Sequence, residues 1–317
     1  YILFRSLVAS SPEMYFLRSF SLPSVSSYSS VAPHAPRPFG CLSRRYAPVR
    51  RALPFRVFCL SHSFCWARVG FLSVSSPLLI ATHCEDDVLI AENLEKARQE
   101  FGDDIPAYMH ARIRDDEACF RSSSYAIDLA KKTGARLHLL HVSSARELNL
   151  LSAMKPGSYK KITAEACTHH LFFAQEDYAT KGNLIKVNPS VKTAQDRDAL
   201  WEALLSDRID TIGSDHAPHT LEEKSRPYLK CPSGGPMIQH TLPAVLSEVS
   251  KGRLSLELAV EKMCHNPARI FQIERRGFIR EGYFADAVLV EFNSPWRAHR
   301  ESLKYKCGWS AFEDRMF

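Results

Sequence analysis

"ARLHLLHVSSARELNLLSAM", residues 135–154, changes from an apolar run to helical spacing within a few residues. The apolar half is typical of a buried strand, and Ser143 or Ser144 is placed to cap the helix that comes next. The same switch occurs in "PLLIATHCEDD", residues 77–87, which precedes the helically spaced residues 88–102. Strands that alternate with helices predict a parallel sheet with right-handed crossovers, an α/β architecture.

Two later apolar runs also end in polar residues. "KKITAEACTHHLFF" (160–173) and "RIDTIGSDHAPHTLEEK" (208–224) bring His, Glu or Asp to the ends of predicted strands. Four successive strands with such ends favour a closed barrel, whose site is built at the carboxyl rim from several strands, over an open doubly wound sheet. No glycine-rich phosphate loop follows these strands, which counts against a nucleotide-binding sheet. Helical spacing marks four further segments: 115–134, 193–208, 237–252 and 254–273.

The net charge of +6 is concentrated in the first 76 residues. That stretch holds nine Arg, a single acid (Glu13) and no Lys, so the rest of the chain carries a net charge of −2. The body of the chain therefore gives no electrostatic reason to expect nucleic acid as a partner. Its apolar runs are also shorter than the roughly 20 residues that a membrane-spanning helix needs.

Residues 1–76 are rich in Ser, Arg, Pro and Phe and show neither a helical period nor a strand alternation. We therefore assign them no fold and expect them to be disordered. Their Arg-rich, acid-poor composition is typical of organellar transit peptides, which makes targeting one interpretation. The favoured interpretation is a segment that is not a native partner of residues 77–317, because the chain starts with Tyr1 instead of Met.

The nine cysteines are scattered along the chain. They are odd in number, and none lies in a C-x-x-C pair, so they do not form a disulfide framework. This pattern indicates a reducing compartment, and we predict a cytoplasmic location.

Three polar residues stand at or just past the ends of predicted strands: His83, His141 and Asp215. Neutral imidazole nitrogens and a carboxylate oxygen are ligands that zinc prefers in catalytic sites, where one position stays open. Each residue taken alone is more often a satisfied core or loop residue. Their repeated placement at one edge of a sheet predicts a metal site that joins three strands.

Other acids and histidines near strand ends have two interpretations. Glu165, His169 and His170 either take part in the metal site or serve the fold, through a buried hydrogen bond and as caps of the sheet. His138 alternates with His141 along one strand, and we expect it to face the helices. Four histidines without a partner pattern are assigned structural roles: His110, His240, His265 and His299.

Six stretches carry a family resemblance through their order and spacing: "THCED", "LLHVSSARE", "EACTHHLFF", "KVNPSVKTAQDRDALWEAL", "SDHAPHTLEEK" and "HNPARIF". Together they resemble the dihydroorotases of the amidohydrolase superfamily over about residues 77–317. The resemblance implies a (β/α)8 TIM-type barrel with zinc at its carboxyl rim. It implies small-molecule substrates, dihydroorotate and N-carbamoyl-aspartate, which are interconverted in pyrimidine biosynthesis. We count a homo-oligomer among the expected assemblies.

The resemblance also implies roles for the residues at the strand ends. His83 and His141 correspond to the metal ligands after the fifth and sixth strands. Asp215 corresponds to the eighth-strand carboxylate, which binds metal and acts as the general base. Glu165 matches a seventh-strand acid near the metals.

Two more positions are implied to hold the substrate, namely Asn188 and His219. His219 lies four residues after Asp215 in the same loop, where it is expected to hydrogen-bond a substrate carboxylate. The next charged residues in this stretch are expected on a solvated helix face: Glu222, Glu223 and Lys224.

The chain departs from the family pattern before its fifth strand. The family begins with His-x-His-x-Arg, has an Asn on the second strand and commonly carries a carboxylated Lys on the fourth strand that bridges two metals. This chain has none of these, and its first Lys is Lys96. We therefore expect about half a barrel, strands five to eight. One or two zinc ions are implied, but the residues that a second site needs are missing, so we expect weak or no activity.

The expected domain organisation has three parts. Residues 1–76 do not match the family, residues 77–275 form the partial barrel, and residues 276–317 form an incomplete flanking β-domain. The last assignment rests on "GFIREGYFADAVLVEF" (277–292), which resembles the return into the small β-domain of the family.

Two alternatives remain open at this point. An allantoinase or hydantoinase uses the same cyclic amide chemistry, although "SDHAPHTLEEK" with "KVNPSVK" fits a dihydroorotase better. A non-catalytic protein with the amidohydrolase fold, acting as an assembly or regulatory partner, is favoured by the missing first-strand motif and opposed by the presence of His83, His141 and Asp215.

Overall fold

The computed structural model describes residues 57–60, 78–157 and 159–317. The expectations for residues 1–76 therefore lie outside the described residues, apart from Val57–Leu60. This segment is strand β1, and it pairs in parallel with β2 (Leu79–Thr82). A short piece of the stretch to which the sequence assigned no fold thus lies in the sheet.

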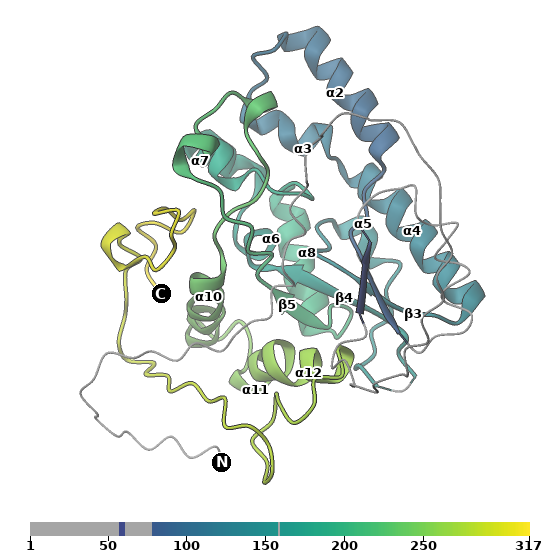
Figure 1. The fold of residues 1–317 in the computed structure, drawn as a ribbon, viewed down its shortest axis with the longest axis vertical. Coiled ribbons are helices and arrows are strands. Elements are labelled where there is room, and N and C mark those ends of the chain that lie inside the picture. Colours follow the sequence, from purple (N-terminus) through teal and green to yellow (C-terminus); the bar gives the residue numbers. More distant parts are fainter. Residues whose placement is uncertain (1–56, 61–77, 158) are drawn as a thin grey trace, which may run out of the picture.

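The sheet has five strands in chain order, and each neighbouring pair is parallel (Figure 1). The strands after β2 are β3 (Arg136–Leu139), β4 (Ile162–Cys167) and β5 (Thr211–Gly213). Sequential parallel order is the order of one arc of a barrel. Among the described strands, β1 and β5 do not pair with each other, so the sheet stays open. The prediction of an α/β fold with part of a barrel is confirmed.

The register brings the carboxyl ends of the strands to one edge. Thr82 at the end of β2 lies opposite Leu139 at the end of β3, and Cys167 at the end of β4 lies opposite Gly213 at the end of β5. Because β2, β3, β4 and β5 run in the same direction, the loops that follow them emerge at the same edge of the sheet. The predicted site residues lie in these loops or at the strand ends.

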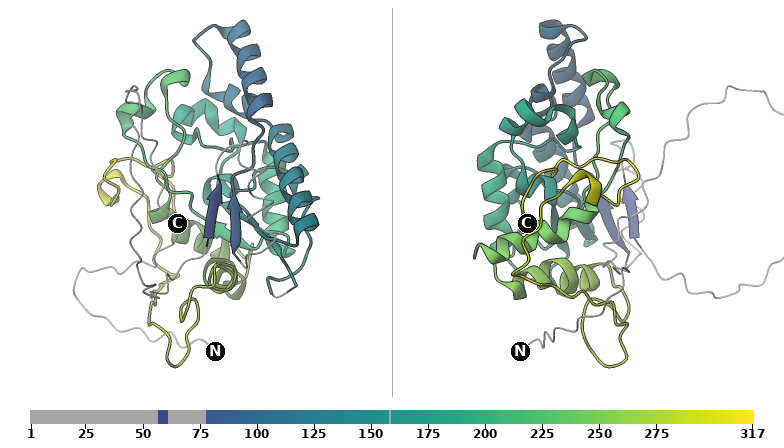
Figure 2. Two further views of the ribbon diagram at one scale, coloured as in Figure 1. Left: turned by 45° about the vertical axis from the view of Figure 1, so that its right-hand side comes forward. Right: turned by 90° about the vertical axis from the view of Figure 1, so that its left-hand side faces the viewer.

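Two long helices begin at Asp residues that cap them, and glycines follow their last turns. Asp86 caps α2 (Asp87–Phe101) and Asp115 caps α4 (Asp116–Thr133), each by accepting hydrogen bonds from backbone N–H groups of the first turn. Gly134, in the left-handed conformation, ends α4. Figure 2 shows both helices stacked along one side of the molecule.

The helix predicted after the third strand starts as expected but is short. Ser144 and Glu147 form a reciprocal capping box, and α5 comprises only Ala145–Leu148. The next long helix, α8 (Ala194–Leu205), also starts with a capping box, in which Asp196 participates. The Asp196 carboxylate additionally accepts a hydrogen bond of 2.8 Å from the backbone of Ala145. One acid therefore ties the starts of α5 and α8 together.

The main core lies between the sheet and these helices. Leu137 and Leu139 of β3 pack there with Ile127 of α4 and Trp201 of α8, and all four side chains are buried. Burial of one leucine side chain contributes about 1.5–3 kcal/mol. The Trp201 indole also donates a hydrogen bond of 2.7 Å to the carbonyl oxygen of Leu171, which satisfies its polar atom.

His138 does not face the helices, so that prediction was wrong. Its neighbours Leu137 and Leu139 occupy the helix-facing side, whereas the His138 ring contacts Thr163 at 2.8 Å and Glu165 at 3.5 Å on β4. The physical reason is that β3 ends at Leu139. The alternation of side chains between the two faces of the strand therefore stops before His141. The face on which His138 lies cannot be deduced from the position of His141.

The helix predicted over residues 254–273 is divided in three. Its parts are α11 (Leu256–Val260), a π-helical turn (Glu261–His265) and α12 (Asn266–Ile270). Lys262 in the π-helical turn is buried and donates hydrogen bonds to the Asp207 carboxylate at 2.7 Å and to the carbonyl oxygen of Ile209 at 2.8 Å. A buried ammonium group needs such partners, and they lie on the segment that leads into β5.

The remaining helices and turns complete the described chain. The remaining α-helices are α3 (His110–Ile113), α6 (Thr168–Phe172), α7 (Tyr178–Lys181), α9 (Leu221–Lys224) and α10 (Ile238–Ser250). Five 3-10 turns occur among the described residues, at Ala107–Met109, Gln175–Asp177, Gly182–Ile185, Tyr228–Lys230 and Arg300–Ser302. None of the helices in these ranges is both long and apolar enough to cross a membrane.

The segment after α12 folds back on α10. Arg297 and Met316 form an isolated antiparallel bridge, and the His240 ring of α10 stacks on both Trp296 and Phe317. Residues 276–317, which end in yellow beside α10 in Figure 1, contain this bridge but no ladder of strands in the described structure. The assignment of residues 276–317 to a β-domain stays a prediction.

Candidate functional site

Two of the predicted site residues lie in the left-handed region of backbone space. His141 follows β3 with φ of 37°, and Asp215 follows β5 with φ of 43°. Residues other than glycine rarely adopt this conformation, and it persists where the surrounding structure imposes it. Both residues stand where a parallel strand ends, so the strain lies at the edge that carries the predicted site.

His83 and His141 are in direct contact. The Nδ1 atom of His83 lies 3.1 Å from the Nε2 atom of His141, and the two rings meet edge to face with centroids 4.8 Å apart. Burial, aided by the nearby His83, lowers the pKa of His141 to about 3. The His141 imidazole is therefore neutral at physiological pH, which is the form that binds metals.

The spacing of the two nitrogens suits a metal ion. Two imidazole nitrogens bound to one tetrahedral zinc at about 2.0–2.1 Å would lie roughly 3.3 Å apart, close to the observed 3.1 Å. The other ring nitrogen of His141, Nδ1, is buried and has no hydrogen-bond partner among the described groups. The donor chemistry and the spacing of this pair thus fit zinc.

Asp215 is the third predicted ligand, and it does not join the pair in contact. Burial raises the pKa of its carboxyl, and Glu165 raises it further, whereas His169 and His83 lower it. These groups therefore lie within electrostatic range of Asp215. Within the described ranges, no three His, Cys, Asp or Glu side chains are grouped so that they could hold one metal ion. The structure brings two of the three predicted ligands together.

Glu165 lines the same edge and touches both histidines of β3 and its loop. Its carboxylate accepts a hydrogen bond of 3.4 Å from the backbone N–H of His141 and lies 3.5 Å from the ring of His138. Burial acts to raise the pKa of Glu165, but His138 and His141 lower it more, so the group is ionised. A Cβ atom at Gly213 of β5 would lie 3.0 Å from the Glu165 carboxyl carbon, so glycine there leaves room for this side chain.

His169 and His170 are buried at the start of α6. His170 has a partner, since its Nε2 atom lies 2.9 Å from the carbonyl oxygen of Pro189. His169 has none for either ring nitrogen among the described groups. Burial lowers the pKa of His169 to about 4, with Asp215 and His141 within electrostatic range. His170 thus serves the fold, whereas His169 borders the site with both nitrogens unused.

Sequence reasoning missed Glu85 and Arg114. The Nε2 atom of His83 lies 3.0 Å from Oε2 of Glu85, and the Arg114 guanidinium donates a hydrogen bond to the same oxygen. Burial acts to raise the pKa of Glu85, but His83 and Arg114 hold it at about 2. The signal was present in "THCED", where an acid follows the predicted ligand by two residues. Arg114 is 29 residues away from Glu85, and no local pattern points to it.

The two predicted substrate-binding residues lie in different surroundings. The Oδ1 atom of Asn188 is buried and has no hydrogen-bond partner among the described groups. His219 is half-buried, its Nε2 atom lies 3.1 Å from the carbonyl oxygen of Ser233, and its own carbonyl oxygen accepts a hydrogen bond of 2.7 Å from the indole of Trp309. Their roles toward a substrate stay predictions.

Lys224 does not lie on a solvated helix face, so that prediction was wrong. Its neighbour Glu222 is exposed, and Glu223 is half-buried. The Lys224 side chain is 2% exposed. Its ammonium group donates to three backbone carbonyl oxygens, those of Lys186 at 3.1 Å, Pro232 at 3.0 Å and Gly234 at 2.9 Å. The reason is that the loop after β5 folds over the lysine, which then satisfies carbonyl groups that water cannot reach.

Four other described histidines contact structural partners, and the last one, His299, is exposed. His216 accepts a hydrogen bond of 3.1 Å from the backbone N–H of Met237, next to the start of α10. His110 is buried between the Tyr228 hydroxyl and the carbonyl oxygen of Val187, both at 2.8 Å. His240 and His265 contact Ser310 and Phe278, respectively. The predicted structural roles of His110, His240 and His265 fit these contacts.

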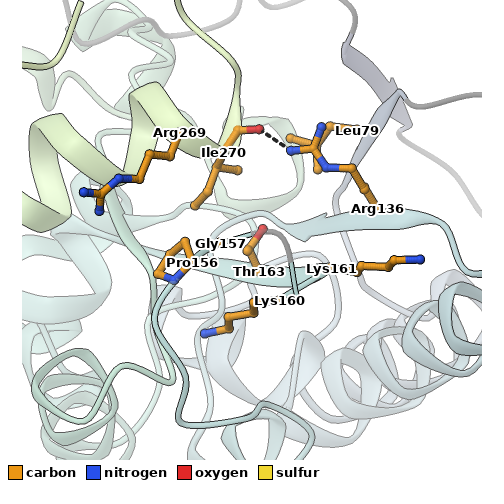
Figure 3. A pocket seen from close by; sticks show the side chains of 9 residues that line it. All are labelled: Leu79, Arg136, Pro156, Gly157, Lys160, Lys161, Thr163, Arg269 and Ile270. Atoms are coloured by element: carbon orange, nitrogen blue, oxygen red, sulfur yellow. Dashed lines mark hydrogen bonds between the residues drawn. The ribbon is translucent and has the colours of Figure 1, made fainter.

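A hollow at the opposite edge of the sheet, near the starts of β2 to β4, does not form the site. Figure 3 shows that the long side chains of Lys161 and Arg269 point away from each other there. The Arg136 guanidinium donates a hydrogen bond of 2.7 Å to the carbonyl oxygen of Ile270, and Lys160 forms an ion pair of 2.7 Å with Asp210. These cations either have protein partners or face outward, so they do not converge on a ligand.

Comparison with known proteins agrees with this geometry. Residues 78–310 match the model of the Amidohydrolase family. The dihydroorotase of Halobacterium salinarum is 32% identical over 241 residues, which cover 76% of this chain and 54% of the relative. The dihydroorotase of Pyrococcus abyssi is 39% identical over 189 residues, 59% of this chain and 44% of the relative. The chain thus spans about half the length of the curated relatives that it matches.

Solved structures show the same fold. A D-hydantoinase (dihydropyrimidinase) from Thermus sp. superposes with a TM-score of 0.73 at 20% identity, over 83% of this chain and 61% of the other. An L-hydantoinase (dihydropyrimidinase) from Arthrobacter aurescens gives a TM-score of 0.73 at 24% identity, over 82% of this chain and 60% of the other. At these identities, the likeness concerns the arrangement of strands and helices.

Proposed function

The chain belongs to the amidohydrolase family, and we propose that it carries the site of a dihydroorotase, which interconverts dihydroorotate and N-carbamoyl-aspartate in pyrimidine biosynthesis. The observation that carries the proposal is the contact of 3.1 Å between the facing nitrogens of His83 and His141 at the carboxyl edge of the sheet. The similarity to curated dihydroorotases favours this substrate over other cyclic amides.

Zinc is the proposed cofactor. His83 and His141 would hold it, together with Asp215, which lies within electrostatic range of His83. Zinc supplies Lewis acidity that polarises a carbonyl oxygen and makes a nucleophile available near neutral pH. The contact between His83 and His141 supports at least one such ion.

Asp215 is the proposed general base and acid. Its carboxylate accepts a proton from the attacking water and returns it to the ring nitrogen as the carbon–nitrogen bond breaks. Proton transfer by a positioned group is typically worth 10²- to 10⁴-fold in rate. Burial and the nearby Glu165 raise the pKa of Asp215, which brings the carboxyl closer to the range where it can both take and give a proton.

Asn188 and His219 are the proposed substrate-binding residues. The buried Oδ1 atom of Asn188 has no described partner, so it has an acceptor to offer to a ring N–H group. The Nε2 atom of His219 contacts the carbonyl oxygen of Ser233, and its Nδ1 atom lies 3.9 Å from Oε2 of Glu223. In its protonated form, this ring can donate to a substrate carboxylate.

The proposed setting is the cytoplasm, in keeping with a reducing compartment, because six cysteines between residues 84 and 307 are free thiols. Residues 77–275 are proposed as the catalytic unit and residues 276–317 as part of a flanking domain. A homo-oligomer is the proposed assembly, which light scattering on the purified chain tests.

The test uses the purified 317-residue chain, with bound zinc quantified by elemental analysis. Cyclisation of N-carbamoyl-aspartate and hydrolysis of dihydroorotate are measured with and without added zinc, beside hydantoin and allantoin as competing substrates. We expect about one zinc ion per chain and weak turnover, with dihydroorotate as the only substrate among these cyclic amides. Turnover of hydantoin or allantoin in place of dihydroorotate transfers the assignment to that class of cyclic amidase.

A non-catalytic role is the second candidate. Two features favour it: the sheet stays open among the described strands, and Asp215 does not complete a three-ligand group there. Under this alternative, the chain neither retains stoichiometric zinc nor turns over any of the four substrates. The same measurements therefore decide between the two.

A further inference from the structure

Each ring nitrogen of His83 faces a different partner. Nδ1 lies 3.1 Å from Nε2 of His141, and Nε2 lies 3.0 Å from Oε2 of Glu85. An ionised carboxylate can only accept a hydrogen bond, so the hydrogen of a neutral His83 ring sits on Nε2. Nδ1 then keeps its lone pair, and this lone pair points toward His141.

The Glu85 carboxylate is fixed in place. Its side chain is fully buried, and Oε2 accepts from both His83 and the guanidinium of Arg114. Glu85 also precedes Asp86, the cap of α2, whose backbone N–H donates a hydrogen bond of 3.0 Å to the carbonyl oxygen of Ala118. The chain on the Glu85 side therefore cannot shift without loosening the start of α2.

Arg114 is fixed as well. It ends α3, where its backbone N–H donates a hydrogen bond of 3.0 Å to the carbonyl oxygen of His110. Its own carbonyl oxygen accepts a hydrogen bond of 2.6 Å from the Ser190 hydroxyl. Arg114 therefore reaches Glu85 from a backbone that is held on both sides.

His83 itself is not held by burial. Its side chain keeps 27% of its surface exposed, whereas the carboxylate beside it has none. A half-open imidazole can rotate about its side-chain bonds unless a hydrogen bond selects one orientation. Glu85 is the ionised group that supplies such a bond at Nε2, while the contact with His141 lies at Nδ1.

We infer that Glu85 and Arg114 form a clamp that fixes His83 as its Nε2–H tautomer and aims its Nδ1 lone pair at the place where a metal ion meets His141. The inference rests on the proposed function for its purpose, since the clamp serves a metal-binding ring. Metal-ligating histidines generally donate their other N–H to a carboxylate, and loss of such a partner typically costs 10- to 100-fold in metal affinity. Glu85 and Arg114 are thus positioning residues.

The clamp differs from an ordinary buried ion pair in what it controls. Loss of an ion pair that only stabilises the fold would lower the free energy of unfolding but leave the tautomer of His83 unchanged. The buried pair Lys160–Asp210, at 2.7 Å, provides such a comparison, because Lys160 lies beside the hollow at the opposite edge of the sheet. Asp210→Ala is therefore the matched control for Glu85→Ala.

The experiment determines the His83 tautomer in the metal-free 317-residue chain. Two-bond ¹H–¹⁵N correlation spectra of protein labelled at histidine are recorded above pH 8, where imidazoles are neutral, and His83 is assigned with a His83→Gln variant. We expect the Nε2–H form in wild type and in Asp210→Ala, and a mixture of both forms in Glu85→Ala. A wild-type ring in the Nδ1–H form overturns the proposal, and this reading needs no variant of Glu85.

Zinc affinity is the second readout, measured by competition with a chelator. We expect Glu85→Ala to bind zinc 10- to 100-fold more weakly than wild type, and Glu85→Gln, which keeps an acceptor oxygen, to recover part of this loss. Equal affinities of wild type and Glu85→Ala overturn the proposal, as does a glutamine variant no better than alanine. Absence of turnover in wild type counts against the proposed function alone, because the tautomer is read without metal.

Discussion

The Nδ1 atom of His83 and the Nε2 atom of His141 lie 3.1 Å apart, although 58 residues separate them in the chain. The contact follows from the register of β2 and β3, in which Thr82 lies opposite Leu139. Each histidine then needs only a short extension past its strand to meet the other. Parallel pairing of β2 with β3 thus brings two residues that are distant in the sequence into contact through their ring nitrogens.

Replacement of Asp215 tests the proton transfer. Asp215→Asn keeps the size of the side chain but removes its basicity, so we expect kcat for dihydroorotate to fall 10²- to 10⁴-fold with a much smaller change in KM. Steady-state kinetics with saturating zinc measures both. The exposed Asp198→Asn serves as the control and should match wild type. A loss of less than tenfold in Asp215→Asn removes the general base from the proposal.

Stability should fall as the pH drops, because His110 is buried as a neutral ring. Burial, aided by the charges of Lys186 and Arg114, lowers the pKa of His110 to about 3. The folded pKa lies below the unfolded value of about 6.5, so the unfolded chain binds more protons. The contribution is therefore complete above pH 6.5 and is lost as the pH falls toward 3.

The size of this effect can be measured by urea unfolding at pH 7.5 and pH 5. For His110 alone, we expect the free energy of unfolding to be ~2 kcal/mol lower at pH 5. His110→Gln has no imidazole to protonate, so its drop between the two pH values should be smaller by that amount. Parallel profiles for wild type and His110→Gln would falsify this assignment.

Removal of the Lys224 ammonium group should loosen the loop after β5. Lys224→Met removes a donor from three carbonyl oxygens, of which that of Lys186 keeps the backbone N–H of Gly234, and we expect a loss of ~3 kcal/mol in the free energy of unfolding. Glu222→Ala in the same short helix is the control, since its side chain is 85% exposed and surface changes stay within about 0.5 kcal/mol. If the two variants are equally stable, the carbonyl contacts of Lys224 are not what holds the loop.

Gly234 tests the same loop from its other side. With φ of +130°, a Cβ atom there would meet the carbonyl oxygen of Ala217 at 2.5 Å, so Gly234→Ala must displace the backbone two residues beyond Asp215. We expect a loss of at least ~2 kcal/mol in stability together with weaker zinc binding. Gly252→Ala has a positive φ but open space around it, so it should cost only ~1 kcal/mol and leave zinc binding unchanged. Thermal unfolding and chelator competition compare the two.

Local sequence signals predicted much of the scaffold. The start of α5 at Ser144 and the end of α4 at Gly134 depend on contacts within a few residues, so each could be located from the sequence. The strand-end positions of His83 and His141 were likewise visible in apolar runs. For such features, neighbours in the chain are also the physical partners.

Features that depend on distant partners were missed. Lys224 reads as part of a charged helix, yet its three acceptors lie on loops up to 38 residues away. Arg114 belongs to α3, and only the tertiary fold brings it to Glu85. The face of the sheet on which His138 lies could not be deduced from the position of His141, because β3 ends between the two residues. Each error has the same cause, a contact that the local pattern does not contain.

The left-handed backbone at His141 and Asp215 places thermal stability and metal binding in conflict. Glycine at either position would relieve about 1 kcal/mol of steric conflict, yet it would delete an imidazole or a carboxylate from the rim. A screen that rewards thermal tolerance alone should therefore enrich glycine at the half-buried Asp215, whereas at His141 the cavity left by the buried ring offsets the relief. The enriched clones should survive heating better than their parent while losing the metal.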